Sequence, residues 1–332
     1  MKALVYSGPN QLIWKDEPDP QPLPGEALVR VNAVGICGSD MHAYHGLDER
    51  RPAPLILGHE AAGRILTGRM AGQRVTINPL VTCGHCRACL DGCSHLCRMR
   101  QIISMPARPG AFAEMVRIPE ANLVAIPDAM PMMHAAVAEP MAVAWHAVRR
   151  GVSLLRRPLA ASRCLVIGGG AIGVAIALVL FHFAARDVYL TELNARRRMT
   201  ASKAMPDLHV HAPGDGKQPE EMSIDLIFDA VGTDTTRTAA SAIVRPGGII
   251  VHVGLLPGNS GVNIRKLTLQ EITLIGSYCY THLDFLETVD ALANKHFGAM
   301  TWVEERKLED GAQVFKDLDR GNVASAKIIL TI

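Results

Sequence analysis

A glycine-rich turn between an apolar run and a helix-forming stretch constrains the fold of this 332-residue chain most strongly. Its glycines, Gly168, Gly170 and Gly173 in GGGAIG, follow the run CLVI directly and open a helical stretch from Ala171. Glu192 ends the next apolar run, VYLTE, about 20 residues further on. Such glycines allow a tight turn, the helix N-terminus receives a pyrophosphate, and the carboxylate accepts hydrogen bonds from ribose hydroxyls. The pattern predicts a dinucleotide site, with a tightly packed turn that binds no ligand as the alternative.

The segments on either side of this turn predict two kinds of architecture. After Cys164, apolar strands alternate with helical stretches, which implies right-handed crossovers and a mostly parallel, doubly wound sheet. The first third carries short β-like runs broken by Gly and Pro, at residues 3–6, 27–31, 63–66 and 74–77. A helical run at 283–295 precedes a last strand at 326–330, which we expect to return to the β-rich part. At about 150 residues per domain, the length fits two domains.

Cysteines form the densest local cluster in the chain. Cys83, Cys86, Cys89 and Cys97 are spaced C-x2-C-x2-C-x7-C, which suits a closed, tetrahedral four-thiolate zinc site. Such a site leaves no position for substrate, so its role would be structural, and Cys93 is left over. The alternative is a set of buried free thiols.

A second constellation is thinner in sequence. Cys37 lies in GICGSDMH, His59 and Glu60 lie in LGHE, and Glu139 lies in AEPMAVAWH. A thiolate, an imidazole and a carboxylate around zinc would leave one position for water or a substrate oxygen, as at a catalytic zinc. Each motif alone is weak, because a single histidine is usually a neutral, hydrogen-bonded residue.

Charge and hydropathy exclude other classes of function. Lys plus Arg total 34 against 32 for Asp plus Glu, far from the basic excess that nucleic-acid binding requires. The longest apolar stretch, residues 171–183, is shorter than a membrane helix, and the N-terminal segment lacks the apolar core of a signal peptide. We expect a cytoplasmic protein with a small-molecule partner, without nucleic acid or membrane as partners.

Taken together, the motifs resemble the zinc-containing medium-chain dehydrogenase/reductase (alcohol dehydrogenase) family, in its sorbitol or polyol dehydrogenase branch. The resemblance is carried, in family order, by GEALVRVNAVGICGSDMH, LGHEAAG, the four cysteines, GAFAEMVRIP, AEPMAVAWHAV, VIGGGAIG and DAVG. It implies an α/β fold: a Rossmann NAD-binding domain at residues 144–282, inserted into a β-rich, GroES-like, zinc-binding catalytic domain at 1–143 and 283–332. The active site would lie in the cleft between them, and the oligomer would be a homotetramer or homodimer.

The same resemblance assigns the metal ligands. Cys37, His59 and Glu60 would hold a catalytic zinc, with a water as the fourth ligand, and the four cysteines would hold a second, structural zinc. Glu139 stands where the alcohol dehydrogenase branch has a ligand cysteine, and would bind the zinc-bound water or exchange onto the metal.

Two further side chains would move the hydroxyl proton. The resemblance places Ser39 to take this proton and His42 as a later member of the relay. The local sequence alone also allows a loop cap for Ser39 and a surface position for His42.

The cofactor contacts implied by the resemblance run along the Rossmann domain. Ile172 and Glu192 would line the adenosine half, with Arg197 near its ribose, and the segments 253–255 and 277–279 would line the nicotinamide. The full set is Gly168, Gly170, Ile172, Gly173, Glu192, Arg197, Val231, Val253, Gly254, Leu255, Ser277, Tyr278 and Cys279. Glu192 would repel a 2′-phosphate and so favours NAD over NADP, although the arginines at 196–198 could be either a solvated face or a phosphate contact. One departure is Cys279, which precedes Tyr280 where the sorbitol enzymes usually carry arginine.

The implied activity is a zinc-dependent transfer of hydride between NAD and a secondary alcohol, which could be a hydroxyl of a polyol, a sugar acid or a cyclitol. Two alternatives stay open: a non-catalytic or regulatory NAD-binding protein, and an NADP-dependent alcohol dehydrogenase of another substrate class. Cys37, His59 and the four cysteines argue against a zinc-free reductase of the same fold, and the net charge of +2 argues against a nucleic-acid zinc module.

Overall fold

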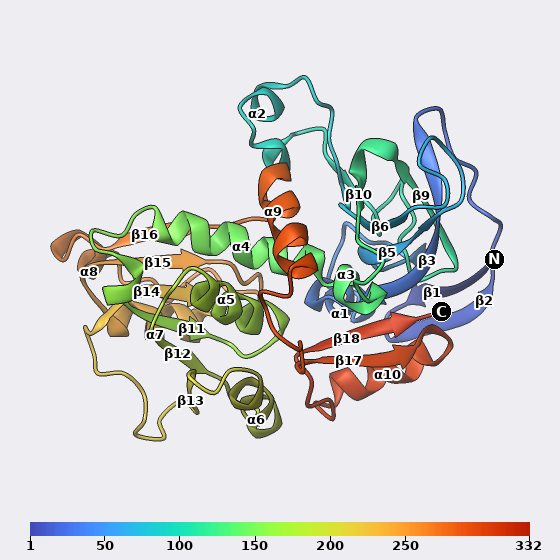
Figure 1. Ribbon diagram of the computed structural model, residues 1–332. Helices are drawn as coiled ribbons and strands as arrows, with labels where there is room; N and C mark the ends of the chain where they lie inside the picture. The colour runs from blue at the N-terminus through green and yellow to red at the C-terminus, as the bar shows by residue number, and fades with distance from the viewer.

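The computed structural model describes residues 1–332 and shows two bodies joined through the long helix α4 (Ala138–Val152) (Figure 1). One body is built on a six-stranded parallel sheet with the strand order β13-β12-β11-β14-β15-β16. Its strands are β11 (Arg163–Ile167), β12 (Asp187–Thr191), β13 (His209–His211), β14 (Ile224–Asp229), β15 (Val244–His252) and β16 (Thr273–Gly276). The predicted doubly wound parallel sheet is confirmed.

Helices cover both faces of this sheet. They are α5 (Ala171–His182), α6 (Ala195–Ala204), α7 (Asp234–Ile243), α8 (Ile264–Leu269) and α9 (His282–Ala293), with α4 packed on α5 and α9. Successive residues of β11 enter different cores: Cys164 and Val166 pack with α4 and α5, and Leu165 and Ile167 pack on the opposite face with α7. Because side chains of a strand alternate between faces, a strand buried on both faces is apolar throughout, which explains the run CLVI.

The other body is β-rich. Its main sheet has the order β10-β6-β5-β3-β18-β17, with β9 also paired to β3, and a smaller sheet has the order β2-β1-β4. The main-sheet strands are β3 (Glu26–Gly35), β5 (Glu60–Ile65), β6 (Arg74–Ile77), β9 (Met115–Pro119), β10 (Leu123–Ala125), β17 (Val303–Lys307) and β18 (Lys327–Thr331). The smaller sheet has β1 (Lys2–Gly8), β2 (Gln11–Asp16) and β4 (Leu55–Ile56), and the short helices are α1 (Gly38–Tyr44), α3 (Met132–Ala136) and α10 (Gly311–Asp319).

The last strand closes the topology as the sequence predicts. β18 returns to the β-rich body and pairs antiparallel with β3, with Ile329 opposite Gly35. Strands from the two ends of the chain therefore build one sheet, and the parallel-sheet strands β11 to β16 lie between β10 and β17 in sequence. None of the helices is both long and apolar enough to cross a membrane.

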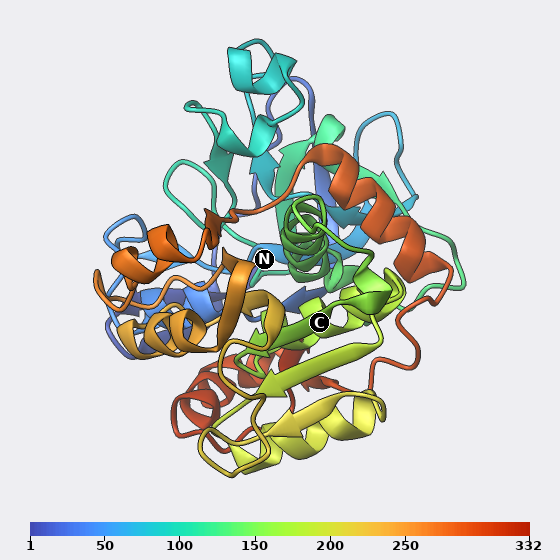
Figure 2. The same ribbon diagram turned by 90° about the vertical axis from the view of Figure 1, so that its left-hand side faces the viewer.

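A separate lobe projects from the β-rich body. It runs between β7 (Leu80–Val81) and β8 (Gln101–Ile102) and contains α2 (Arg87–Leu90) and a short 3-10 turn at Ser94–Leu96. In Figure 1 and in the turned view of Figure 2, this lobe, coloured cyan, forms the top of the molecule. Little regular structure holds it together, so its shape depends on what its cysteines bind.

Candidate functional site

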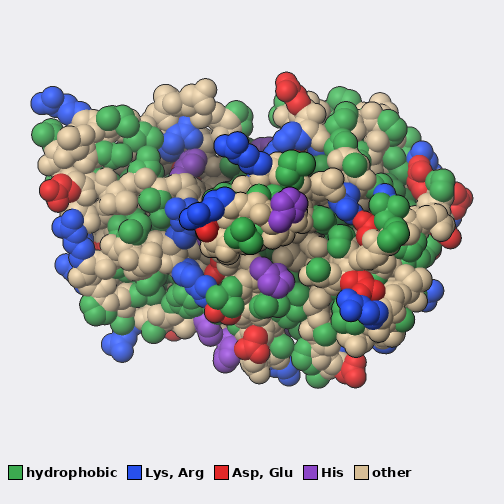
Figure 3. All heavy atoms as spheres, turned by 90° about the horizontal axis from the view of Figure 1, so that it is seen from above, with side chains coloured by type: hydrophobic (Ala, Val, Ile, Leu, Met, Phe, Trp, Pro, Cys, Tyr) green, Lys and Arg blue, Asp and Glu red, His purple; other side chains and the backbone are tan.

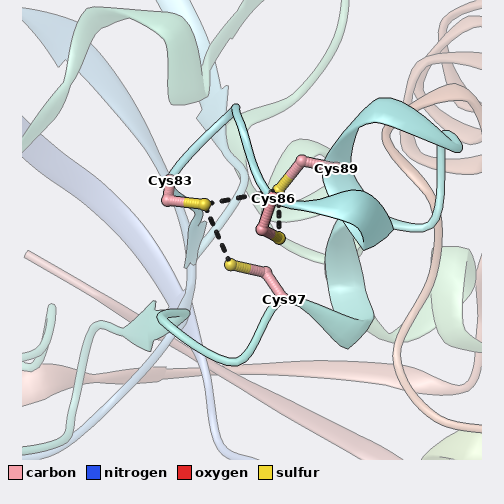
Figure 4. Close-up of side chains that lie close together, drawn as sticks. All are labelled: Cys83, Cys86, Cys89 and Cys97. Atoms are coloured by element: carbon pink, nitrogen blue, oxygen red, sulfur yellow. Dashed lines mark hydrogen bonds between the residues drawn. The ribbon is translucent and has the colours of Figure 1, made fainter.

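The four cysteines of the projecting lobe turn their sulfurs toward one point (Figure 4). The sulfur of Cys83 lies 3.6 Å from that of Cys97 and 3.9 Å from that of Cys89, and the sulfurs of Cys86 and Cys89 are 3.6 Å apart. Sulfurs at about 2.3 Å from a tetrahedral zinc would be separated by about 3.8 Å, whereas a disulfide brings them to about 2 Å. The spacing therefore fits zinc and excludes disulfides, and Cys93 lies outside the group.

The electrostatics of this group also fit a cation. Backbone N–H groups of His85 and Cys86 lower the pKa of the Cys83 thiol to about 6, which favours its thiolate. Burial, together with the neighbouring thiol of Cys86, raises the pKa of Cys89 to about 11. Four sulfurs this close cannot all be thiolates without a cation among them, because like charges oppose one another.

A second group of possible metal ligands forms where two strands of the β-rich body meet. Cys37 precedes α1, and His59 and Glu60 stand at the start of β5; their ligand atoms lie within 4.8 Å of one another. The pairing of β3 with β5 sets Gly35 opposite Glu60. A Cβ at Gly35 would come within 1.9 Å of the Glu60 carboxylate, so glycine makes room for that side chain.

Asp40, which the sequence analysis passed over, orients this group. Its fully buried carboxylate accepts a hydrogen bond from the Cys37 N–H at 3.0 Å and lies 3.6 Å from Nδ1 of His59. Burial opposes ionisation, but His59 and Arg51 lower the pKa of Asp40, and Asp40 in turn raises that of His59 despite burial. A carboxylate on one ring nitrogen leaves the other for a metal, which is the usual arrangement around metal-binding histidines. GICGSDMH contains this aspartate, so its position could have been noticed.

Lys327 is the second residue that the sequence analysis missed. It lies in β18, 1 % exposed, and its Nζ donates to Oε1 of Glu60 at 2.6 Å and to the carbonyl of Ile36 at 2.8 Å. The ion pair holds the Glu60 carboxylate beside Cys37 and offsets its negative charge. A lysine within the apolar strand KIILT was the only sequence signal, and its partner lies far away along the chain.

Glu139 lies beside this group but is not one of its three members. It is buried in the first turn of α4 and interacts electrostatically with His59, Glu60 and the hydroxyl of Tyr280. Burial raises the pKa of Glu139 to about 7, and the charge of Glu60 acts in the same direction. Its predicted position next to the ligands agrees with this geometry, and its role there stays a prediction.

Ser39 and His42 both lie on α1, one turn apart. The carbonyl of Ser39 accepts a hydrogen bond from Arg51 at 3.1 Å, and no hydrogen bond joins the Ser39 hydroxyl to the His42 ring. Partial burial lowers the pKa of His42, so its ring is neutral and able to accept a proton near pH 7. The structure thus places both residues on the short helix that follows Cys37, without forming the relay itself, and their roles stay predictions.

The glycine-rich turn between β11 and α5 has the geometry that its sequence predicts. Gly168 has φ of 101°, and a Cβ at Gly173 would lie 1.7 Å from the carbonyl oxygen of Gly168. A Cβ at Gly170, at the N-cap of α5, would meet no atom within 4 Å. Two glycines therefore serve the tight turn, and the third opens space above a helix N-terminus, where a phosphate would bind.

Glu192 lies directly after the end of β12 rather than within it, and faces this turn. Its Oε2 accepts a hydrogen bond from the Gly169 N–H and its Oε1 accepts one from the Asn194 N–H, both at 2.7 Å. The carboxylate is thus fixed beside the turn, as a ribose-binding acid requires. Ile172 lies half-buried in the first turn of α5, on the other side of Gly170.

The three arginines after Glu192 differ in what they bind. Arg196 donates to the carbonyl of Asn322, and Arg198 donates to the carbonyl of Glu192 at 2.8 Å. Arg197 retains a buried Nε with no hydrogen-bond partner, and its position near the ribose stays a prediction.

Asp229, at the end of β14, organises the turns predicted to line the nicotinamide. Its carboxylate accepts hydrogen bonds from the N–H groups of Val231 at 3.0 Å and Gly232 at 2.8 Å, and its carbonyl accepts from Val253 and Gly254, both at 2.9 Å. The carboxyl ends of β14 and β15 are thus tied into one surface, and Leu255 is exposed beside it. Asp229 lies in the motif DAVG, but its role could not be predicted from that motif alone.

The segment after β16 completes this edge of the sheet. Ser277 donates its N–H to the carbonyl of His252 at 2.9 Å, and its buried hydroxyl has no partner. Tyr278 follows, and Cys279 has φ of 46°, a conformation that non-glycine residues adopt rarely. Cys279 interacts electrostatically with Cys37 and Glu139, so this segment lies next to the metal group. The end of this segment therefore lies near Cys37 of the metal group, and its contact with the nicotinamide stays a prediction.

Comparison with protein families identifies the two halves. Residues 23–128 match the profile of the alcohol dehydrogenase GroES-like domain, and residues 171–294 match that of the zinc-binding dehydrogenases. An L-threonine 3-dehydrogenase of Chelativorans sp. (strain BNC1) is 32% identical over 295 residues, covering 84% of this chain and 83% of the relative. The chain belongs to the zinc-binding alcohol dehydrogenases. An L-galactonate-5-dehydrogenase of Escherichia coli (strain K12) is 31% identical, covering 86% of this dehydrogenase and 85% of the relative.

Solved structures share the dehydrogenase's whole architecture. Acetophenone reductase from Geotrichum candidum NBRC 4597, in complex with NAD, superposes with a TM-score of 0.85 at 26% identity, covering 100% of this chain and 97% of that one. A zinc-binding dehydrogenase from Sinorhizobium meliloti 1021 bound to NADP gives 0.83 at 26% identity, covering 100% and 99%. Neighbours of the same fold thus bind either nicotinamide cofactor. The four-cysteine lobe lies inside the matched GroES-like span, so it is part of the dehydrogenase rather than a separate nucleic-acid module.

Proposed function

We propose that this dehydrogenase transfers a hydride between NAD and a secondary hydroxyl of a polyol, sugar acid or cyclitol, at a zinc held by Cys37, His59 and Glu60. The observation that carries the proposal is the convergence of these three ligand atoms within 4.8 Å, beside the segment that follows β16 of the parallel sheet. A thiolate, an imidazole and a carboxylate leave a coordination position free, whereas the four-cysteine group does not.

The two zinc ions and NAD would each supply a different chemistry when bound. A zinc among Cys37, His59 and Glu60 supplies Lewis acidity that lowers the pKa of a substrate hydroxyl, and NAD supplies the hydride acceptor. Asp40 holds His59 in the ligand orientation, and Lys327 limits the negative charge around Glu60. A second zinc among Cys83, Cys86, Cys89 and Cys97 would fix the lobe.

The proton of the substrate hydroxyl leaves, in this proposal, through α1. Ser39 takes it and His42 receives it one helical turn further along, where the lowered pKa keeps the ring neutral beforehand. Glu139, with its pKa of about 7, holds or releases a proton at the water beside the ligands. The glycine turn, Asp229 and the segment 277–279 position the cofactor against this group.

NAD is the proposed cofactor rather than NADP. The Glu192 carboxylate, fixed by two backbone hydrogen bonds, lies where the adenosine ribose would bind and would repel a 2′-phosphate. Arg196 and Arg198 each donate to a carbonyl group, whereas the buried Nε of Arg197 has no partner, so we expect Arg197 to be the arginine that faces the ribose.

The finer assignments belong to the same proposal. We place the domain bounds at 1–143 with 283–332 and at 144–282, the protein in the cytoplasm, and its assembly as a homotetramer or homodimer. Relatives named for L-threonine and L-galactonate support a hydroxyl-bearing small molecule as substrate.

The proposal is tested by metal content and turnover together. Purified protein should carry two zinc ions per chain and form NADH with at least one member of a panel of polyols, sugar acids, cyclitols and hydroxy amino acids. Cys37→Ser should lose one zinc and all turnover while still binding NADH, and Cys93→Ser, a cysteine outside both groups, should lose neither.

One outcome would favour a non-catalytic NAD-binding protein instead. If wild-type protein holds two zinc ions and binds NADH but oxidises no member of the panel, with NADP equally inert, the catalytic proposal is wrong. Turnover that survives Cys37→Ser would show that the zinc group named here does not carry the chemistry.

A further inference from the structure

Arginine side chains from the β-rich body lie near Tyr278 and Cys279 of the other body. Figure 3 shows Lys and Arg side chains on both sides of an indentation between the two bodies. Arg100 follows the four-cysteine lobe, and Arg50 and Arg51 follow α1, so both groups come from elements next to proposed metal sites. None of these arginines is among the metal ligands or cofactor contacts proposed above.

Arg100 is held in position with most of its donors free. Its Nη1 donates to the carbonyl of Cys97 at 3.0 Å, and its guanidinium carbon lies 5.0 Å from the centre of the Tyr278 ring. The stacking contact spans the two bodies and fixes the plane of the guanidinium. Of five N–H donors, one is engaged with Cys97, so the remaining edge can bind an anion in the two-pronged geometry that carboxylates favour.

The neighbouring arginines keep this part of the cleft positive. Asp48 pairs with Arg50 at 2.8 Å and with Arg51 at 2.9 Å, so a single carboxylate serves two guanidinium groups. Arg51 is buried and also donates to the carbonyls of Ser39 and Ser104, which marks it as structural. The charge of Arg50, which is exposed, acts on Tyr278 and Cys279 from the same side as Arg100 does.

Cys279 links this positive region to the metal group. Its half-buried side chain lies within electrostatic reach of Arg100, of Cys37 and of Glu139. A substrate chain lying along Cys279 would therefore have one end at the metal ligands and the other at Arg100. The strained backbone at Cys279, with φ of 46°, is held at this junction of the two bodies.

We propose that the substrate is a hydroxy acid whose carboxylate is bound by the Arg100 guanidinium, while its secondary hydroxyl reaches the group of Cys37, His59 and Glu60. This inference rests on the proposed function and narrows it, from secondary alcohols in general to polyhydroxy carboxylates. Arg50 contributes attraction at longer range, and Arg100 determines specificity because it is stacked, oriented and retains free donors.

The test compares hexonic acids with the hexitols of the same configuration and with hexitol phosphates. Wild-type protein should show a higher kcat/KM for a hexonate than for its matching hexitol. Arg100→Gln should lower kcat/KM for the hexonate about 10- to 100-fold, mainly through KM, because a hydrogen bond to a charged group is lost. Arg100→Lys should recover only part of this loss, and NADH binding should not change. Arg98→Gln, an exposed arginine of the same loop without contacts, is the matched control.

The outcomes separate this inference from the proposed function. Turnover of neutral hexitols at least equal to that of hexonates, or hexonate kinetics unchanged in Arg100→Gln, would overturn the inference while the dehydrogenase activity stands. Preference for hexitol phosphates that depends on Arg100 would overturn the carboxylate in favour of a phosphate. Absence of NADH formation with every compound would instead be a failure of the proposed function.

Discussion

Replacing Gly173 by alanine should lower the stability of the protein, whereas replacing Gly170 by alanine should lower its affinity for NADH, because the two glycines have different surroundings. In Gly173→Ala the new Cβ would lie 1.7 Å from the Gly168 carbonyl oxygen, where ordinary contacts begin at 3.4 Å. A backbone carbonyl cannot move aside like a side-chain tip, so helix α5 must shift away from the turn. We expect a loss of about 3 kcal/mol in the free energy of unfolding, the upper part of the range for overpacked sites.

Gly170→Ala meets no atom within 4 Å and keeps an ordinary φ of -76°. Its cost to stability should stay below about 1 kcal/mol, the scale of an N-cap change. Its methyl group, however, would occupy the space through which the pyrophosphate approaches the backbone, so NADH affinity should fall at least about tenfold, or 1.4 kcal/mol. Urea unfolding and NADH titration by fluorescence measure the two quantities separately. Unchanged NADH affinity in Gly170→Ala would refute the placement of the cofactor on this turn.

Three other perturbations have defined outcomes. Lys327→Met leaves a buried carboxylate unpaired and should cost about 3–5 kcal/mol in urea unfolding, against less than about 1 kcal/mol for Lys307→Met, whose ion pair is exposed. Cys97→Ser should remove one zinc and destabilise the lobe, which elemental analysis and limited proteolysis detect, whereas Cys93→Ser should do neither. Burial opposes ionisation of Asp229, but the hydrogen bonds that its carboxylate accepts lower its pKa below the ordinary value. The ionised side chain therefore stabilises the folded protein at neutral pH, and this stabilisation is lost as the pH falls below about 4. In Asp229→Asn, the free energy of unfolding should vary less with pH in that range.

The features that the sequence predicts well are those formed by residues close to one another along the chain. The turn at Gly168, Gly170 and Gly173 forms from adjacent residues, and the four cysteines of the lobe lie within one loop. Their geometry depends little on the rest of the chain. The parallel sheet follows equally from local patterns, because strands buried on both faces are apolar throughout.

The features that the sequence analysis missed depend on pairing between distant segments. Lys327 meets Glu60 only because β18 returns beside β3, and this register cannot be read from either motif alone. Asp40 is visible in its motif, but the motif does not show whether its carboxylate is buried or exposed. That becomes clear only in the fold, where the carboxylate lies against the His59 ring. Arg100 and Tyr278 come from different bodies, so their stacking has no sequence signature.

The most direct test of the central claim follows a single hydrogen from substrate to cofactor. The substrate identified in the panel would be deuterated at its carbinol carbon and given to zinc-loaded protein and to protein treated with a chelator. The mass of the NADH formed would be measured by mass spectrometry, together with the rate of its formation. Hydride transfer at this site predicts one deuterium in each NADH and a rate that falls on chelation and returns with zinc in wild type but not in Cys37→Ser. Unlabelled NADH, or a rate indifferent to zinc, would contradict hydride transfer at the site of Cys37, His59 and Glu60.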